Sequence, residues 1–106
     1  MLEKDEAKAA EFYQRAAMKG DADAQFNLAK LYAEGKGIKK NEREAARLYE
    51  LAANQGDASA QNNLGVMYQN GTCVNKNELE AVHLYKLAAS QKNAWAQYNL
   101  ALAHRN

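Results

Sequence analysis

The side chains best suited to nucleophilic or metal chemistry in this 106-residue chain are one cysteine and two histidines, Cys73, His83 and His104. They do not have the short spacings that nucleophile–base pairs or metal ligands use. The sequence also lacks Ser-x-x-Lys, Gly-x-Ser-x-Gly and His-Glu-x-x-His motifs. We therefore expect no catalytic residue, no metal and no cofactor. We interpret Cys73 as a small residue in place of glycine rather than as a reactive thiol, and both histidines as structural or surface residues.

Two short motifs could bind phosphate or carry a glycan. The loop Gly35-Lys-Gly37 recurs only as Gly71-Thr-Cys73, so we interpret it as a turn rather than as a phosphate-binding loop. Asn70-Gly-Thr72 matches a glycosylation sequon. The first residues are charged where a signal peptide would be apolar, so we interpret the sequon as a coincidence.

A row of amides is the pattern most suggestive of binding. Asn27, Asn63 and Asn99 are spaced 36 residues apart, and such a row could hydrogen-bond the backbone of an extended peptide. The alternative is that each amide caps or bridges within the fold, as we expect of the glutamines two positions before them.

The same interval relates the whole sequence to itself. Residues 21–56 and 57–92 are identical at 19 of 36 aligned positions. Residues 1–20 match the second half of a repeat and residues 93–106 match the first half. Self-similarity at this period indicates a stacked-repeat protein. We expect one helical-repeat domain over residues 1–106, as a fragment of a longer array.

Each repeat is predicted to form two antiparallel helices, which gives an all-α solenoid of about six helices. Apolar residues recur at spacings of three and four, proline is absent and alanine is abundant. The predicted helices lie near residues 5–19, 22–34, 42–55, 58–70, 78–91 and 94–104. Helices this short are marginal alone in water, so stacking of their apolar faces must stabilise them.

Residues at the helix ends agree with these boundaries. Suitable N-caps precede the first helix of each repeat, at Asp21, Asp57 and Asn93. Capping boxes are predicted before the second helices, at Asn41 with Glu44 and at Asn77 with Glu80. Glycine follows four helices, where a left-handed residue is needed. Lys92 replaces that glycine once, at a cost of about 1 kcal/mol if it is left-handed.

Composition narrows the class of partner. Hydrophobic residues make up 47% of the chain, charged residues 25%, and the formal net charge is +1. A balanced charge does not favour nucleic-acid binding. No apolar run approaches the ~18 residues that span a bilayer. We expect a soluble protein with no membrane insertion, which is either cytosolic or begins after its targeting segment.

The repeat resembles a known superfamily at Ala60, Leu64, Gly65 and Tyr68, an Ala-x-x-x-Leu-Gly-x-x-Tyr pattern that is similar to tetratricopeptides. Tetratricopeptides repeat every ~34 residues and usually carry a proline. The longer loop, Glu-Ala-x-x-Leu-Tyr, Ala-Ala and Gly-Asp-Ala-x-Ala-Gln resemble the Sel-one-like repeat (SLR) family over the whole chain. Five residues depart from the pattern: Ala29, Cys73, Lys92, Ala101 and His104.

The resemblance implies a right-handed superhelix of helix pairs that works as a protein-interaction scaffold. By analogy with tetratricopeptides, the first helices line the concave face, and their varying positions contact a partner. The predicted contacts are Phe26, Asn27, Lys30, Asn62, Asn63, Val66, Gln69, Trp95, Tyr98 and Asn99. The residues predicted to build the stack are Ala24, Leu28, Tyr32, Tyr49, Ala60, Leu64, Gly65, Tyr68, Tyr85, Ala96 and Leu100. The large rings among the contacts could instead pack against a neighbouring repeat.

The leading functional prediction is a non-catalytic scaffold or adaptor that binds a protein or peptide. Two alternatives come from related proteins. Some helical repeats bind RNA, which the balanced charge disfavours. Cysteine-rich relatives are linked to β-lactam binding or hydrolysis, but they carry paired cysteines, and this chain has one. Both ends of the array are also expected to expose faces meant for another repeat, through which chains could pair.

Overall fold

The computed structural model describes residues 2–104, and side chains from residue 5. Within that part it contains six α-helices and no strand, which confirms the predicted all-α architecture. They are α1 (Leu2–Met18), α2 (Ala22–Glu34), α3 (Glu42–Asn54), α4 (Ala58–Asn70), α5 (Glu78–Ser90) and α6 (Ala94–His104). The predicted boundaries hold to within one residue, except that α1 begins at Leu2. The residues added there are mostly good helix formers.

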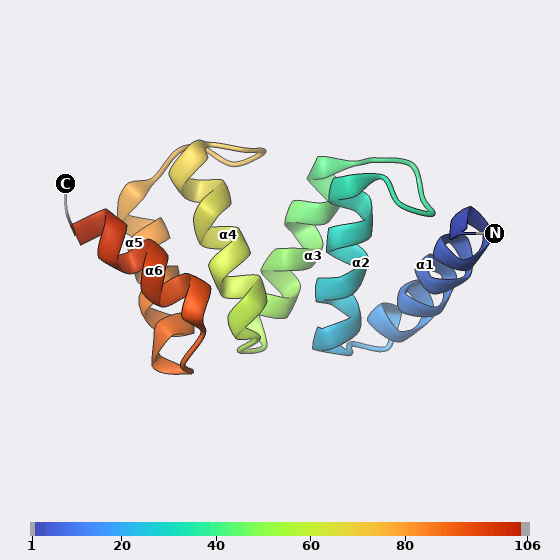
Figure 1. Ribbon diagram of the computed structural model, residues 1–106, viewed down its shortest axis with the longest axis horizontal. Helices are drawn as coiled ribbons and strands as arrows, with labels where there is room; N and C mark the ends of the chain where they lie inside the picture. Colours follow the sequence, from blue (N-terminus) through green and yellow to red (C-terminus); the bar gives the residue numbers. More distant parts are fainter. Residues whose placement is uncertain (1, 105–106) are drawn as a thin grey trace.

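The helices follow one another along the long axis of a 44 × 23 × 22 Å molecule. Helix α1 lies at one end and α6 at the other (Figure 1). The two longer loops, residues 35–41 and 71–77, lie at the same edge of the stack, and the short junctions before α2, α4 and α6 lie at the opposite edge (Figure 1). This is the solenoid of helix pairs that the 36-residue period predicts.

The first helices begin at their predicted caps. Asp21 Oδ1 accepts from the Ala24 amide at 3.2 Å, Asp57 Oδ1 from the Ala60 amide at 2.9 Å, and Asn93 Oδ1 from the Ala96 amide at 2.9 Å. Each bond satisfies one amide that the first turn of a helix leaves without a partner.

The second helices confirm one of the two hydrogen bonds that a capping box predicts. Asn41 Oδ1 accepts from the Glu44 amide at 3.1 Å, as expected. The Asn41 amide, however, donates to the Tyr32 carbonyl at 2.9 Å, and the Glu44 carboxylate binds Arg47. Asn77 behaves in the same way, with its amide bonded to the Tyr68 carbonyl at 2.9 Å. The returning loop therefore ties the start of each second helix to the end of the first, and the glutamate is left for other contacts.

Two non-glycine residues have a left-handed backbone conformation. Cys73 has φ 61° and Lys92 has φ 67°. Their counterparts one repeat earlier, Gly37 and Gly56, have φ 72° and 94°. The stack therefore imposes the same backbone conformation whether or not glycine is present, and each substituted position costs about 1 kcal/mol.

Recurring small and apolar residues form the core between the helices. Of the residues predicted to build the stack, those that are buried are Ala24, Leu28, Tyr49, Ala60, Leu64, Gly65, Tyr85 and Ala96. Those that are half-buried are Tyr32, Tyr68 and Leu100. Leu100 is less covered than Leu28 and Leu64 because no described helix packs on its side of α6.

Glutamines connect successive helix pairs. Gln55 Nε2 donates both to Gln25 Oε1 and to the Gly20 carbonyl, each at 2.9 Å. One repeat later, Gln91 Nε2 donates to Gln61 Oε1 at 3.2 Å and to the Gly56 carbonyl at 2.8 Å. We call each set a glutamine clasp. The clasps satisfy the buried side chains of Gln25 and Gln61 and confirm the bridging role expected of these two glutamines. The third glutamine in register, Gln97, is exposed.

Candidate partner-binding surface

Two of the three first helices carry no charged side chain. We call the surface of α2, α4 and α6 the first-helix face, and the surface of α1, α3 and α5 the second-helix face. Helices α4 and α6, over residues 58–70 and 94–104, contain no aspartate, glutamate, lysine or arginine. Helix α3 alone contains five such residues. The centres of protein interfaces are depleted in charge, so the part of the first-helix face formed by α4 and α6 has the composition of an interface, whereas α2 carries Asp23, Lys30 and Glu34.

Two of the three register asparagines are used inside the fold. Asn27 Nδ2 donates to the Asp23 carbonyl of its own helix at 2.9 Å. Asn99 Nδ2 donates to Asn62 Oδ1 at 2.9 Å and so links α6 to α4. A continuous row of free amides is therefore not present, and the alternative interpretation holds for these two residues.

Asn62 requires a correction. Its side chain was predicted to contact a partner, but it is buried, with 7% of its surface exposed. The reason is that α6 lies over it and supplies the Asn99 hydrogen bond. Asn63 differs, because it is half-buried with its side chain near the Tyr49 hydroxyl. Burial raises the pKa of the Tyr49 hydroxyl, and the nearby Asn63 side chain opposes that rise.

The predicted aromatic contacts separate into an internal ring and two outer rings. Phe26 is half-buried against Tyr49, with ring centroids 5.8 Å apart, and Lys30 Nζ lies 5.6 Å from the centre of the Phe26 ring. Trp95 and Tyr98 are 71% and 59% exposed on α6. Phe26 therefore packs within the stack, whereas Trp95 and Tyr98 are exposed on α6, the last helix of the stack, and Tyr98 occupies the position at which Asn62 is buried one repeat earlier.

The remaining predicted contacts, Val66 and Gln69, line two cavities between the first helices. The α2–α4 pocket has a volume of about 230 Å³ and includes Asn63, Val66 and Thr72. The α4–α6 pocket has the same volume and includes Gln69 and Val82. Residues that are 36 positions apart line both pockets: Ala33 and Gln69, Glu42 and Glu78, Ala45 and Ala81, Tyr49 and Tyr85, Met67 and Ala103. The two pockets are therefore the same structural site in successive repeats.

Both pockets have a tyrosine among their lining residues, with an amide beside its hydroxyl. Tyr85 Oη donates to Gln69 Oε1 at 2.6 Å, and burial raises the pKa of the Tyr85 hydroxyl. The corresponding Tyr49 hydroxyl lies near Asn63 instead. Gln69 lies on α4, the first helix before Tyr85, whereas Asn63 lies on α4, the first helix after Tyr49. The two pockets therefore have equivalent lining residues but different polar contacts.

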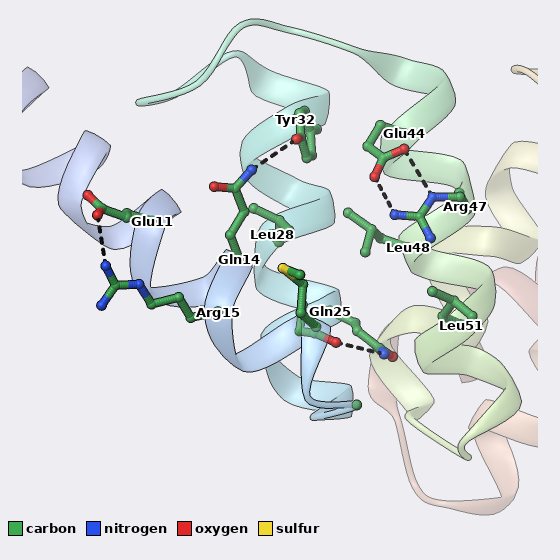
Figure 2. A pocket seen from close by; sticks show the side chains of 13 residues that line it. Glu11, Gln14, Arg15, Gln25, Leu28, Tyr32, Glu44, Arg47, Leu48 and Leu51 are labelled. Atoms are coloured by element: carbon green, nitrogen blue, oxygen red, sulfur yellow. Dashed lines mark hydrogen bonds and ion pairs between the residues drawn. The ribbon is translucent and has the colours of Figure 1, made fainter.

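A larger groove lies on the second-helix face, and sequence reasoning did not identify it. It has a volume of about 680 Å³ between α1 and α3 over α2, and Figure 2 shows its lining side chains. Arg15 binds Glu11 at 3.3 Å on one wall, and Arg47 binds Glu44 on the other. The bond to Arg47 lowers the pKa of the Glu44 carboxyl, although burial opposes this. The charges of each wall are thus already paired within that wall.

The chemically reactive side chains are not among the lining residues of either pocket. Cys73 is exposed in the loop after α4, close to Arg43, and His83 and His104 are exposed on α5 and α6. Over residues 2–104, no cluster of three histidine, cysteine or acidic side chains has the geometry of a metal site. No helix in the same range has both the length and the apolar character needed to cross a bilayer.

Known proteins provide an independent comparison. A family model described as Sel1 repeat matches residues 1–21, 22–57, 58–93 and 96–106. A Sel1 repeat protein from Oxalobacter formigenes has a similar structure, with a TM-score of 0.90 and 33% identity over 93% of this chain. A protective antigen with an SLR fold, present in uropathogenic Escherichia coli strains, gives a TM-score of 0.81 and 39% identity over 85% of this chain.

The chain spans 40% of the length of the first of these structures and 19% of the second. No curated protein matches the sequence.

Proposed function

The chain belongs to the Sel1 repeat family, whose members are generally protein-interaction scaffolds, and on that premise we propose that it is a non-catalytic scaffold that binds a protein or peptide on its first-helix face. We expect this face to be the concave side of the superhelix. The contacts come from the outer side chains of α2, α4 and α6, with Asn63 and Val66 of α4 at their centre and Trp95 at the α6 end.

The observation that carries this proposal is the uncharged surface of α4 and α6. A partner that covers this surface removes few charges from water, which keeps the cost of desolvation low. Trp95 is 71% exposed there, and tryptophan and tyrosine are the side chains that most often dominate binding energy. The charged second helices keep the opposite face hydrated.

The same observation weighs against the RNA-binding alternative. Single-stranded nucleic acid binds along a positively charged groove, and α4 and α6 supply no lysine or arginine over residues 58–70 and 94–104. Lys30 on α2 is a basic residue of the first-helix face, and its charge already lies near the Phe26 ring. A protein or peptide partner therefore fits this face better than a polyanion.

Introducing a charge into this face tests the proposal. Val66→Lys is expected to weaken binders selected from a random peptide-display library by about tenfold or more, because an unpaired ammonium would be desolvated in the interface. The matched control is Glu50→Lys, which adds the same side chain to exposed α3 and should leave affinity unchanged. Affinities can be compared by biolayer interferometry.

Two outcomes would contradict it. Binders that tolerate Val66→Lys as well as Glu50→Lys do not use the first-helix face. Binders that are lost only with Leu51→Lys use the groove between α1 and α3.

We also propose that the outer sides of α1 and α6 are complementary to each other. Phe12 on α1 is 67% exposed, whereas its counterparts Leu48 and Leu84 are 3% and 5% exposed. Gln97 on α6 is exposed, whereas the equivalent Gln25 is 5% exposed. The outer side of α1 is equivalent to the side of α3 that packs against α2, and the outer side of α6 is equivalent to the side of α2 that packs against α3. A second copy or a further repeat can therefore cover them.

Pairing between copies would raise the mean molar mass measured by sedimentation equilibrium as the protein concentration increases. Phe12→Glu is expected to abolish that rise, because it places a charge in the new apolar contact. Gln14→Glu adds the same charge at an exposed position of α1 and serves as the control. A mass that stays monomeric at the highest concentration would exclude pairing between copies.

A further inference from the structure

We propose that Asn70 is a site of self-deamidation, which the C-terminal cap of α4 keeps unreactive until the following loop opens. Asn70 and Gly71 form the only Asn-Gly pair in the sequence. Asparagine is most reactive before glycine, because no side chain shields the glycine nitrogen that attacks it. Asn70 is exposed, so water can reach it. The proposal goes beyond the proposed function and does not depend on what the first-helix face binds.

The reaction needs only the chain itself and water. The Gly71 nitrogen loses its proton and forms a bond to Cγ of the Asn70 side chain, from which ammonia leaves, and the product is a cyclic imide. Water then opens the imide at one of its two carbonyl carbons. One product is aspartate. The other is isoaspartate, in which the main chain runs through the former side chain and is one carbon longer.

The backbone around this pair opposes the first step. Asn70 is the last residue of α4, and Gly71 has a left-handed φ of 72°. The amides of Gly71 and Thr72 both donate to the Met67 carbonyl, whereas the attacking Gly71 nitrogen must give its proton up. Ring closure also requires the backbone of Asn70 to rotate away from the helical ψ of about −42°. The two groups therefore cannot react while the cap is intact.

The returning loop holds the cap closed. The Asn77 amide donates to the Tyr68 carbonyl at 2.9 Å. A Cβ atom on Gly71 would lie 3.3 Å from Lys76 Cβ, so the loop passes closely over the glycine. Deamidation therefore requires these contacts to open, and its rate reports how often the loop 71–77 leaves the end of α4.

The preceding repeat has the same cap without the reactive residue. Glu34 and Gly35 occupy the equivalent positions, and Gly35 has a φ of 70° and donates to the Leu31 carbonyl at 2.7 Å. A carboxylate is therefore compatible with the cap, and the aspartate product can keep it. Isoaspartate cannot, because its longer main chain displaces Gly71 from the position that the cap requires.

Either product changes the surface of α4. This helix has no charged side chain over residues 58–70, and deamidation gives it a carboxylate at its C-terminal end. The negative end of the helix dipole lies there, so the new charge is unfavourable. Deamidation thus converts an uncharged surface into a charged and less stable one, and only in molecules whose loop has opened.

The rate of deamidation in the folded and in the unfolded chain tests the proposal. The whole chain is kept in mildly alkaline buffer, with and without enough urea to unfold it, and the products at residue 70 are counted by peptide mass spectrometry. We expect the unfolded chain to react about a hundredfold faster than the folded chain. Equal rates would overturn the proposal, as would the absence of any reaction in urea. Asn70→Glu, which has the residue of the preceding repeat, is the unreactive control.

Two loop variants separate the opening of this loop from unfolding of the whole chain. Val74 is half-buried, and its counterpart Ile38 packs against the main apolar cluster. Val74→Ala should raise the rate at Asn70 about fourfold, because it weakens the closed loop. Ile38→Ala truncates the equivalent side chain of the preceding loop and should leave the rate unchanged. If Ile38→Ala raises the rate as much, the reaction passes through global unfolding and the proposal is wrong.

The isoaspartate product provides the last check. Isolated from aged protein by ion exchange, it should melt at a lower temperature than Asn70→Asp, which carries the same charge on an unaltered main chain. Equal melting temperatures would show that the cap accepts the longer chain and does not control the reaction.

Discussion

Leu64→Asp is expected to abolish cooperative folding. Leu64 is 4% exposed and belongs to the main apolar cluster. Truncating a buried leucine costs about 2–5 kcal/mol, and an unpaired buried carboxylate adds a further cost of several kcal/mol. The sum matches the whole stability of about 5–15 kcal/mol that a domain of this kind has. Far-ultraviolet circular dichroism during heating should show weak helicity and no cooperative transition.

The control for this change is another leucine. Leu79 is 85% exposed at the start of α5, so Leu79→Asp should alter stability by no more than about 0.5 kcal/mol. An unchanged melting curve for Leu64→Asp would mean that the assigned register of α4 is wrong.

Gly65→Val is expected to lower the stability by about 3 kcal/mol and the melting temperature by about 10–20 °C. A Cβ atom on Gly65 would lie 2.7 Å from Tyr85 Cε1 and 3.3 Å from the Ala81 carbonyl. Tyr85 is fully buried and its hydroxyl is bonded to Gln69, so the ring cannot move without losing contacts. Valine adds two further methyl groups in this direction, although it is a better helix former than glycine.

The comparison with other repeats makes this test specific. The equivalent position on α6 is Ala101, which is exposed, so Ala101→Val should change stability by no more than about 0.5 kcal/mol. Equal melting temperatures for the two variants, measured by differential scanning calorimetry, would show that α4 and α5 do not require glycine for their close approach.

The preceding repeat explains why alanine is tolerated elsewhere. Ala29 is equivalent to Gly65 and is completely buried. Its facing tyrosine, Tyr49, packs against Phe26 and lies near Asn63 on the following helix, whereas Tyr85 bonds Gln69 on the preceding one. The two repeats therefore differ both at this position and in the surroundings of the tyrosine.

The fold could be predicted because its determinants are local and repeated. Asp57 caps α4 by accepting a hydrogen bond from the amide three residues later, and Leu64 and Tyr68 have the spacing of one helical face. Neither feature depends on a distant neighbour, so both can be predicted from the local sequence. The 36-residue period then places every helix next to an equivalent one. The early start of α1 at Leu2 was missed because that end carries no capping signal.

The surface was harder to predict because exposure depends on neighbours one repeat away. Asn62 and Asn63 are adjacent asparagines, and only the position of α6 decides that the first is buried. Glu44, the glutamate of the predicted capping box, binds Arg47 instead of the Asn41 amide. Sequence spacing does not determine which of these polar partners it binds. The pockets are lined by side chains from three helices, so no short sequence motif predicts them.

The glutamine clasps have a mechanical consequence for the array. Gln55 and Gln91 each tie the end of a second helix to the junction before the preceding first helix, so they fix the angle between successive helix pairs. Hydrogen bonds weaken within a few tenths of an ångström and with small changes of angle, whereas apolar faces can slide while remaining in contact. Bending the stack at a junction therefore changes the geometry of a clasp as well as the packing of the helices. The clasps add a directional contribution to the stiffness of the scaffold, beside the non-directional contribution of the apolar core.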